Sequence, residues 1–136
     1  MPVPVARDFV IGWGDCAPSG AVYYPNYFRW FDQSMWELFA ANGAPIPELE
    51  AKFRVVGVPL KRLACDFLAP CRLHDKVRLE SRFAAVGKKD IEIVHELTRG
   101  GVVLVRGHDH RFWGVRAPDG KLTRQAIPDD VAARIR

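Results

Sequence analysis

The stretch from Gly14 to Tyr27 carries the residue types and spacing most suggestive of chemistry. It reads Gly-Asp-Cys-Ala-Pro-Ser-Gly-Ala-Val-Tyr-Tyr-Pro-Asn-Tyr and joins an alternating segment to a strongly amphipathic one. The first amides of a helix have no partner inside the helix, and the helix dipole adds partial positive charge there. Such a junction can stabilise a carbonyl oxygen that becomes negative during a reaction.

The same stretch resembles the signature of the 4-hydroxybenzoyl-CoA thioesterase family of hotdog-fold enzymes. That signature reads Asp-x-Asp-Pro-x-Gly-x-Val-x-Tyr-Pro-x-Tyr, and its second aspartate attacks or hydrates the thioester. The matching positions in this chain are Asp15, Pro18, Gly20, Val22, Tyr24, Pro25, Asn26 and Tyr27. Ala17 stands at the position of the family nucleophile. The resemblance therefore implies a thioesterase site that lacks its central carboxylate.

The resemblance assigns the backbone N–H of Tyr24 to the thioester carbonyl. Asp15 lies two residues before Ala17, about 6 to 7 Å away in extended chain, so it does not replace the nucleophile directly. It remains open whether Asp15 acts as a general base through one water or only shapes the turn. Asp32 and Glu37 are further carboxylate candidates, because a related branch of the family takes its carboxylate from the helix. A solvated helix face explains both equally.

Substrate contacts are predicted at both ends of an acyl-CoA molecule. Tyr23, Tyr27 and Trp30 are candidate walls of an aromatic acyl pocket, with Asp32 as a further substrate-binding residue. Lys88 and Lys89 follow a glycine in a turn, and the resemblance assigns basic residues of that turn to the phosphates of coenzyme A. Two adjacent ammonium groups suit phosphate binding. Coenzyme A belongs to the substrate, so no separate cofactor is expected.

Other chemistry is less favoured by the sequence. His108 and His110 alternate on one strand face and are able to share a metal, but the sequence nominates no third ligand, so no metal site is predicted. No histidine lies near Cys16 in the sequence to activate its thiol, which favours an inert turn residue. A hydratase on the same fold needs a positioned acid/base pair, and neither His74 nor His95 lies in such a motif.

The composition fits one globular domain over residues 1–136. Hydrophobic residues make up 49% of the chain and charged residues 26%, and three cysteines without metal-ligand spacing predict reduced thiols. The net charge of +4 suits a polyanionic ligand but is too diffuse to indicate nucleic acid. With no apolar run long enough for a membrane and no signal-peptide pattern, a cytoplasmic location is expected.

Hydrophobic periodicity predicts the elements that position the site. Residues 3–13 alternate as a strand, and residues 23–42 follow the helical period with one apolar stripe: Tyr27, Trp30, Phe31, Ser34, Met35, Leu38 and Phe39. Pro25 suits the helix start and Gly43 its end. Residues 44–53 indicate a loop with a short helical turn. Further strands are predicted at 55–68, broken or bent near Pro59, and at 75–86, 90–98 and 102–115, and a short helix from residue 128.

One strand, one long helix and four consecutive strands lack the crossovers of a parallel sheet. The order predicts an α+β chain, an antiparallel sheet wrapped around one long central helix, which is also the hotdog fold that the motif implies. Long edge strands favour a homodimer at least, and the family a homotetramer. The sequence thus predicts a thioesterase for a short aromatic acyl-CoA. Two alternatives stay open: a non-catalytic acyl-CoA-binding or regulatory protein, and an engineered rather than natural Ala17.

Overall fold

The computed structural model describes all 136 residues and is built on one five-stranded sheet. Its strands are β1 (Val5–Val10), β2 (Leu60–Phe67), β3 (Lys76–Val86), β4 (Asp90–Arg99) and β5 (Val102–Phe112). They lie in the order β1-β3-β4-β5-β2, and every neighbouring pair is antiparallel. The predicted antiparallel α+β architecture is confirmed, and β1 and β2 form the two edges of the sheet.

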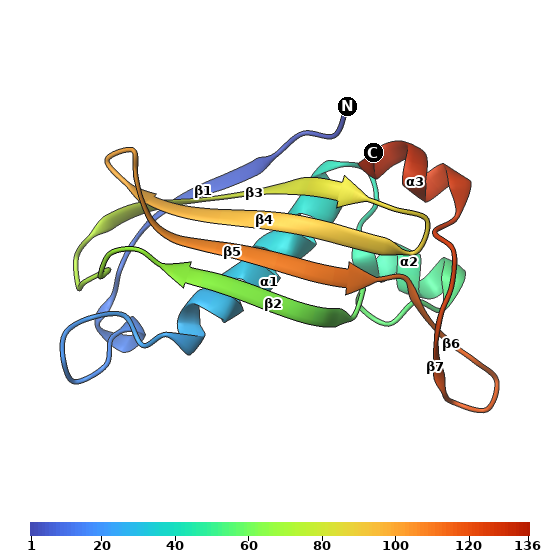
Figure 1. Cartoon of the computed structure of the whole chain (residues 1–136), viewed down its shortest axis with the longest axis horizontal. Coiled ribbons are helices and arrows are strands. Elements are labelled where there is room, and N and C mark those ends of the chain that lie inside the picture. The colour runs from blue at the N-terminus through green and yellow to red at the C-terminus, as the bar shows by residue number, and fades with distance from the viewer.

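The long helix α1 (Pro25–Ala41) packs against one face of this sheet, as Figure 1 shows. Its buried residues are the seven of the predicted stripe: Tyr27, Trp30, Phe31, Ser34, Met35, Leu38 and Phe39. Pro25 begins the helix, and Gly43 follows its end with a φ of +73°. The side chain of Asn42 then ties the helix end to the first strand, since it donates to the carbonyl oxygen of Leu38 and exchanges two hydrogen bonds with the backbone of Val3.

The predictions failed mainly between the sheet strands and after them. Residues 46–53 form a two-turn helix, α2 (Ile46–Phe53), longer than the short helical turn predicted within a loop, because Ile46 and Leu49 bury one face of it in the core. The strand predicted at 55–68 begins only at Leu60, directly after the predicted break near Pro59. The last predicted strand ends at Phe112, and a separate hairpin of β6 (Gly114–Arg116) and β7 (Leu122–Arg124) follows. The predicted C-terminal helix is confirmed as α3 (Asp129–Ile135).

The core divides into two clusters along α1. One lies under the C-terminal half of α1, with α2, α3 and Trp113, and the other lies under its N-terminal half. None of the three helices has both the length and the apolar composition required to cross a membrane.

Close packing between α1 and β5 depends on Gly107. A Cβ atom at this position would lie 2.4 Å from Cε2 of Phe31, whose ring is stacked on His95 at a centroid distance of 4.7 Å. We therefore expect Gly107→Ala to lower the free energy of unfolding by about 1–3 kcal/mol, the usual range for overpacking. Urea denaturation measures this. Gly14→Ala, where nothing lies within 4 Å of the added atom, is the control and should change stability by less than about 0.5 kcal/mol. Equal effects of the two substitutions would contradict the packing argument.

Candidate active site

The start of α1 exposes one free backbone donor. Tyr24 precedes the helix with helical dihedral angles (φ −57°, ψ −32°), and no side chain caps the helix. The N–H of Tyr23 donates to the carbonyl oxygen of Asp15 at 2.9 Å, the N–H of Asn26 donates to Tyr23, and Pro25 has no N–H. The N–H of Tyr24 donates to no protein group. The donor predicted to meet a thioester oxygen is thus unengaged, and Tyr24 is 58% exposed.

Ala17 opens a tight turn beside a surface hollow. Its N–H donates to the carbonyl oxygen of Ala21 at 2.8 Å, and its own carbonyl accepts from Gly20, which closes the turn with a φ of +87°. The hollow has a volume of about 400 Å³. Its walls are Trp13, Cys16, Ala17, Pro18, Gly20 and Leu73. A larger hollow of about 580 Å³ lies along β1 and β3, but it contains none of the predicted site residues.

Asp15 is held by its surroundings but keeps acceptor capacity. Its Oδ2 accepts the N–H of Gly12 at 2.9 Å, and its Oδ1 lies 3.5 Å from the guanidinium of Arg29, a long contact. The side chain of Asn26 donates to its carbonyl oxygen at 2.9 Å. The carboxylate shapes the turn, as one interpretation expected, and Oδ1 remains available to a water molecule.

The three cysteines are all free thiols near this end of α1. Burial raises the pKa of Cys65 to about 11, and it raises the pKa of Cys71 to about 11 as well. Both thiols are therefore neutral at physiological pH, which makes them poor nucleophiles. Cys16 directs its thiol to the carbonyl oxygen of Gly12 at 3.6 Å.

The predicted aromatic pocket residues lie at different depths. Tyr23 is 53% exposed beside Tyr24, whereas Tyr27 and Trp30 are only 4% and 5% exposed. The rings of Tyr27 and Phe67 are 5.8 Å apart, so β2 meets α1 at this end. Burial raises the pKa of Tyr27 and keeps its phenol neutral. In the single chain, Tyr27 and Trp30 serve the core, and Tyr23 faces solvent.

The side chain of Asp32 is held in place by a buried arginine. Its side chain is 59% exposed, and its Oδ1 accepts from Arg111 at 3.2 Å. Arg111 is 5% exposed and also donates to Asp109 at 2.9 Å and to the carbonyl oxygen of Val58 at 3.0 Å. Glu37 lies on the exposed face of α1. Of the two helix carboxylates, only Asp32 is fixed in place by the sheet.

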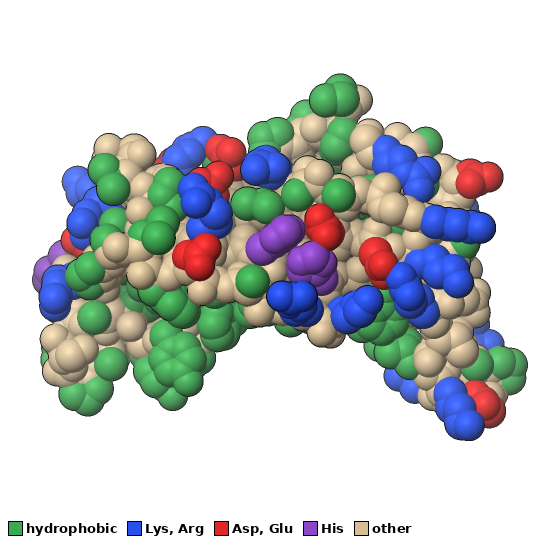
Figure 2. Space-filling model, in the orientation of Figure 1, with side chains coloured by type: hydrophobic (Ala, Val, Ile, Leu, Met, Phe, Trp, Pro, Cys, Tyr) green, Lys and Arg blue, Asp and Glu red, His purple; other side chains and the backbone are tan.

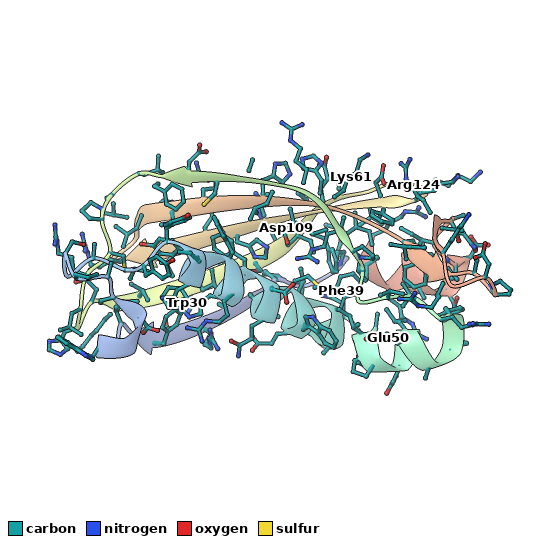
Figure 3. All side chains as sticks on the ribbon, turned by 90° about the horizontal axis from the view of Figure 1, so that it is seen from below. Trp30, Phe39, Glu50, Lys61, Asp109 and Arg124 are labelled. Carbon is teal, nitrogen blue, oxygen red and sulfur yellow. The ribbon has the colours of Figure 1, made fainter.

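A buried polar chain continues from Arg111 across the sheet. Asp109 lies 3.0 Å from Nε2 of His95, and Nδ1 of His95 lies 2.6 Å from the hydroxyl of Ser81. Ser81 in turn lies 2.6 Å from Ser34 of α1. Figure 3 shows Asp109 between the sheet and α1. Every side chain of this polar network has a hydrogen-bond partner, so the network fixes the rotation of α1 against the sheet. It thereby also fixes the direction of the Asp32 carboxylate.

The charge state of Asp109 follows from these partners. Burial alone would raise its pKa, but the hydrogen bond from His95 and the charges of His95 and Arg111 outweigh burial and hold the pKa of Asp109 below its ordinary value. Asp109 is therefore ionised at neutral pH. The sequence alone does not reveal this network, because His95, Asp109 and Arg111 meet only through the register of β4 and β5. The signal available in the sequence was the presence of polar residues at the alternate strand positions that face the core.

The two lysines predicted to bind phosphate are exposed in the turn between β3 and β4. Arg136 adds a third cation, since its guanidinium donates to the carbonyl oxygen of Gly87 at 2.9 Å. This turn and the start of α1 lie at opposite ends of the sheet (Figure 1). One chain therefore does not bring Lys88 and Lys89 to Tyr24.

The sheet order, the antiparallel pairing and the long helix on one face define the hotdog fold. Residues 11–135 match the Thioesterase-like superfamily, and the chain belongs to this family. A relative, 4-hydroxybenzoyl-CoA thioesterase of Pseudomonas sp. strain CBS-3, is 30% identical over 127 residues, which cover 88% of this chain and 89% of the relative.

Solved structures agree with the family. A crystal structure of a 4-hydroxybenzoyl-CoA thioesterase mutant complexed with 4-hydroxybenzoyl-CoA has a TM-score of 0.89 at 22% identity and covers 98% of this chain and 99% of that one. A gentisyl-coenzyme A thioesterase has a TM-score of 0.79 at 26% identity, with coverage of 96% and 98%. The resemblance that the Gly14–Tyr27 motif indicated is confirmed.

Proposed function

We propose that this protein is an acyl-CoA thioesterase that hydrolyses a short aromatic acyl-CoA, similar to 4-hydroxybenzoyl-CoA. The observation that carries the proposal is the unengaged N–H of Tyr24 at the start of α1, in a chain that is 30% identical to a 4-hydroxybenzoyl-CoA thioesterase. One such donor contributes about 3–4 kcal/mol to the stabilisation of an oxyanion.

In the proposed reaction, the thioester oxygen accepts the N–H of Tyr24. A water molecule, deprotonated by Asp15, attacks the carbonyl carbon, and the carbon–oxygen bond forms as the carbonyl oxygen becomes negative. The oxyanion then collapses, the carbon–sulfur bond breaks, and coenzyme A leaves as a thiol after taking up the proton. Because Ala17 supplies no carboxylate, the water route replaces direct attack, and turnover should be slow.

Asp15→Asn tests this assignment. Asparagine keeps an oxygen for the N–H of Gly12 but has no basic oxygen for water, so we expect kcat to fall about 100-fold, the lower end of general-base effects, with KM changed less than about twofold. Steady-state release of coenzyme A thiol measures both constants. Asp8→Asn, on exposed β1, is the matched control. An unchanged kcat would leave Asp15 as a turn residue only.

The acyl pocket is proposed at the exposed surface around the start of α1. Tyr23 would contact the aromatic ring, and Asp32 would bind a polar substituent on the acyl group, because Arg111 fixes its carboxylate at the surface. Tyr27 and Trp30 would form the floor of the pocket beneath these residues. Because both side chains are buried in the single chain, we expect them to support the pocket from beneath rather than to form a side wall.

A second copy is proposed to complete the coenzyme A site. Edge strand β2 carries exposed apolar residues at both ends, among them Leu60 and Phe67. If β2 pairs antiparallel with β2 of a second copy, the Phe67 end, next to Tyr27, meets the partner's opposite end. In each chain, backbone hydrogen bonds of Phe112 and Trp113 connect the Leu60 end of β2 to Lys89. The arrangement brings the lysines of one copy to the thioester site of the other. The homotetramer expected from the family stays a prediction.

Lys88→Ala combined with Lys89→Ala tests the phosphate assignment. Loss of two ammonium–phosphate contacts should raise the dissociation constant of coenzyme A about 10- to 100-fold, because two hydrogen bonds of exposed lysines together contribute about 1–3 kcal/mol. Isothermal titration calorimetry measures it. Lys52→Ala with Lys121→Ala removes the same charge elsewhere and should leave binding unchanged. Equal weakening by both double variants would indicate a net-charge effect rather than a site.

Ala17 favours a second candidate function, an acyl-CoA-binding or regulatory protein that does not hydrolyse its ligand. Thiol release from 4-hydroxybenzoyl-CoA, measured beside calorimetric binding, separates the two. Turnover above the uncatalysed rate supports the thioesterase. Tight binding without turnover supports the regulatory protein, and an absence of both contradicts each candidate.

A further inference from the structure

Three side chains with metal-binding atoms meet on the face of the sheet that points away from α1. They are Glu92 of β4 and His108 and His110 of β5. Glu92 lies opposite His110 in the strand register, and His108 lies two residues earlier on the same face. Figure 2 looks onto this face and shows histidine and acidic side chains gathered near the middle of the sheet.

The ligand atoms converge on one point. Oε1 of Glu92 lies 3.1 Å from Nδ1 of His110, and Oε2 lies 3.7 Å from Nε2 of His108. All three residues offer ligand atoms within 4.8 Å of one another. Ligands of tetrahedral zinc, each about 2.0–2.1 Å from the ion, lie about 3.4 Å apart. The two measured contacts lie on either side of that separation.

The Nε2 atom of His108 supplies an independent observation. This atom is buried and has no hydrogen-bond partner, although a buried polar atom normally has one. It faces Glu92 at a distance too long for a hydrogen bond. A cation between the imidazole and the carboxylate would satisfy both groups.

We propose that Glu92, His108 and His110 bind a divalent transition-metal ion of the zinc class. Two neutral imidazoles and one carboxylate are a donor set that zinc accepts, and three protein ligands leave a coordination position open. The sequence alone supplied the two histidines. The third ligand comes from the register between β4 and β5.

The charged residues around the site determine which further ligand occupies the open coordination position of the metal ion. A small hollow of about 140 Å³ reaches Glu92 and His110 and is lined by Lys61, Arg62, Asp90 and Arg111 as well. Arg62 is the strand partner of His110. The cations Lys61 and Arg62 oppose a bare metal ion, so the open position should take an anion, such as chloride or a carboxylate. The site lies on the face opposite the α1 pocket and does not depend on the proposed thioesterase activity.

Metal titration of the purified full-length protein tests the proposal. Zn²⁺ is titrated against a chromophoric chelator, and Co²⁺ is added as a spectroscopic probe. We expect one tight equivalent of Zn²⁺ per chain and a Co²⁺ spectrum without a thiolate charge-transfer band, because no cysteine belongs to the site.

Single substitutions assign the ligands. His108→Gln, His110→Gln and Glu92→Gln should each weaken Zn²⁺ binding at least 10-fold, whereas His74→Asn should not change it. Circular dichroism confirms that each variant is folded. An absence of stoichiometric binding, a thiolate band with Co²⁺, or unchanged affinity in all three variants would overturn the proposal.

Discussion

Replacing Ala17 with aspartate is expected to raise kcat for 4-hydroxybenzoyl-CoA by up to about 10⁴-fold, the upper range for a positioned acid–base or nucleophilic carboxylate. The turn that Ala17 opens is already closed by its hydrogen bonds to Ala21 and Gly20, and the side chain borders a hollow of about 400 Å³. The new carboxylate therefore needs no change of backbone. Steady-state thiol release on both proteins measures the effect.

Ala17→Asn is the matched control, because it has the size of aspartate without its charge or nucleophilicity. We expect it to remain close to the starting activity. If Ala17→Asp binds the substrate but leaves kcat within about twofold, Ala17 does not stand at a reactive position, and the site must lie elsewhere in the fold.

Arg111→Ala is expected to lower the free energy of unfolding by about 3–5 kcal/mol, the usual result when one partner of a buried ion pair is removed. The substitution leaves the ionised Asp109, 1% exposed, with only His95 as a partner. It also frees the carbonyl oxygen of Val58, whose φ of +52° is rare for a β-branched residue and needs support. Urea denaturation gives the change directly.

Arg106→Ala is the control on the same strand. Arg106 pairs with Glu96 at 3.1 Å on the exposed face, where such a pair contributes about 0–1 kcal/mol. In addition, Arg111→Leu combined with Asp109→Leu should recover part of the lost stability, because the buried carboxylate is removed together with its arginine partner. A similar small loss for Arg111→Ala and Arg106→Ala would contradict the network.

Local sequence patterns were sufficient to predict the helices and strands whose hydrophobic residues repeat with a clear period. The helical stripe from Tyr27 to Phe39 and the alternation of the sheet strands each report one buried face, which is a property of neighbouring residues. The sequence indicated only a short helical turn where α2 forms, since Pro45 and Pro47 favoured a loop, whereas burial of Ile46 and Leu49 in the core supports a helix of two turns. The hairpin of β6 and β7 has strands of three residues, too short to show a period.

The residues of the candidate site also fall into two groups, those that a local motif brings together and those that only the folded sheet brings together. Tyr24, Ala17 and Asp15 lie in one continuous motif, so the sequence placed them together. The network of His95, Asp109 and Arg111, and the cluster of Glu92 with His108 and His110, join separate strands. Strand register brings these groups together, and no local pattern fixes register. The placement of the turn between β3 and β4 and of the start of α1 at opposite ends of the sheet likewise follows only from the folded chain (Figure 1).

A crystal structure of this chain with 4-hydroxybenzoyl-CoA would show directly whether the start of α1 binds the thioester. We expect the thioester oxygen to lie about 2.7–3.1 Å from the backbone nitrogen of Tyr24 and the aromatic ring to lie beside Tyr23. A structure in which side chains fill the start of α1, or in which the thioester binds at another surface, would contradict this expectation.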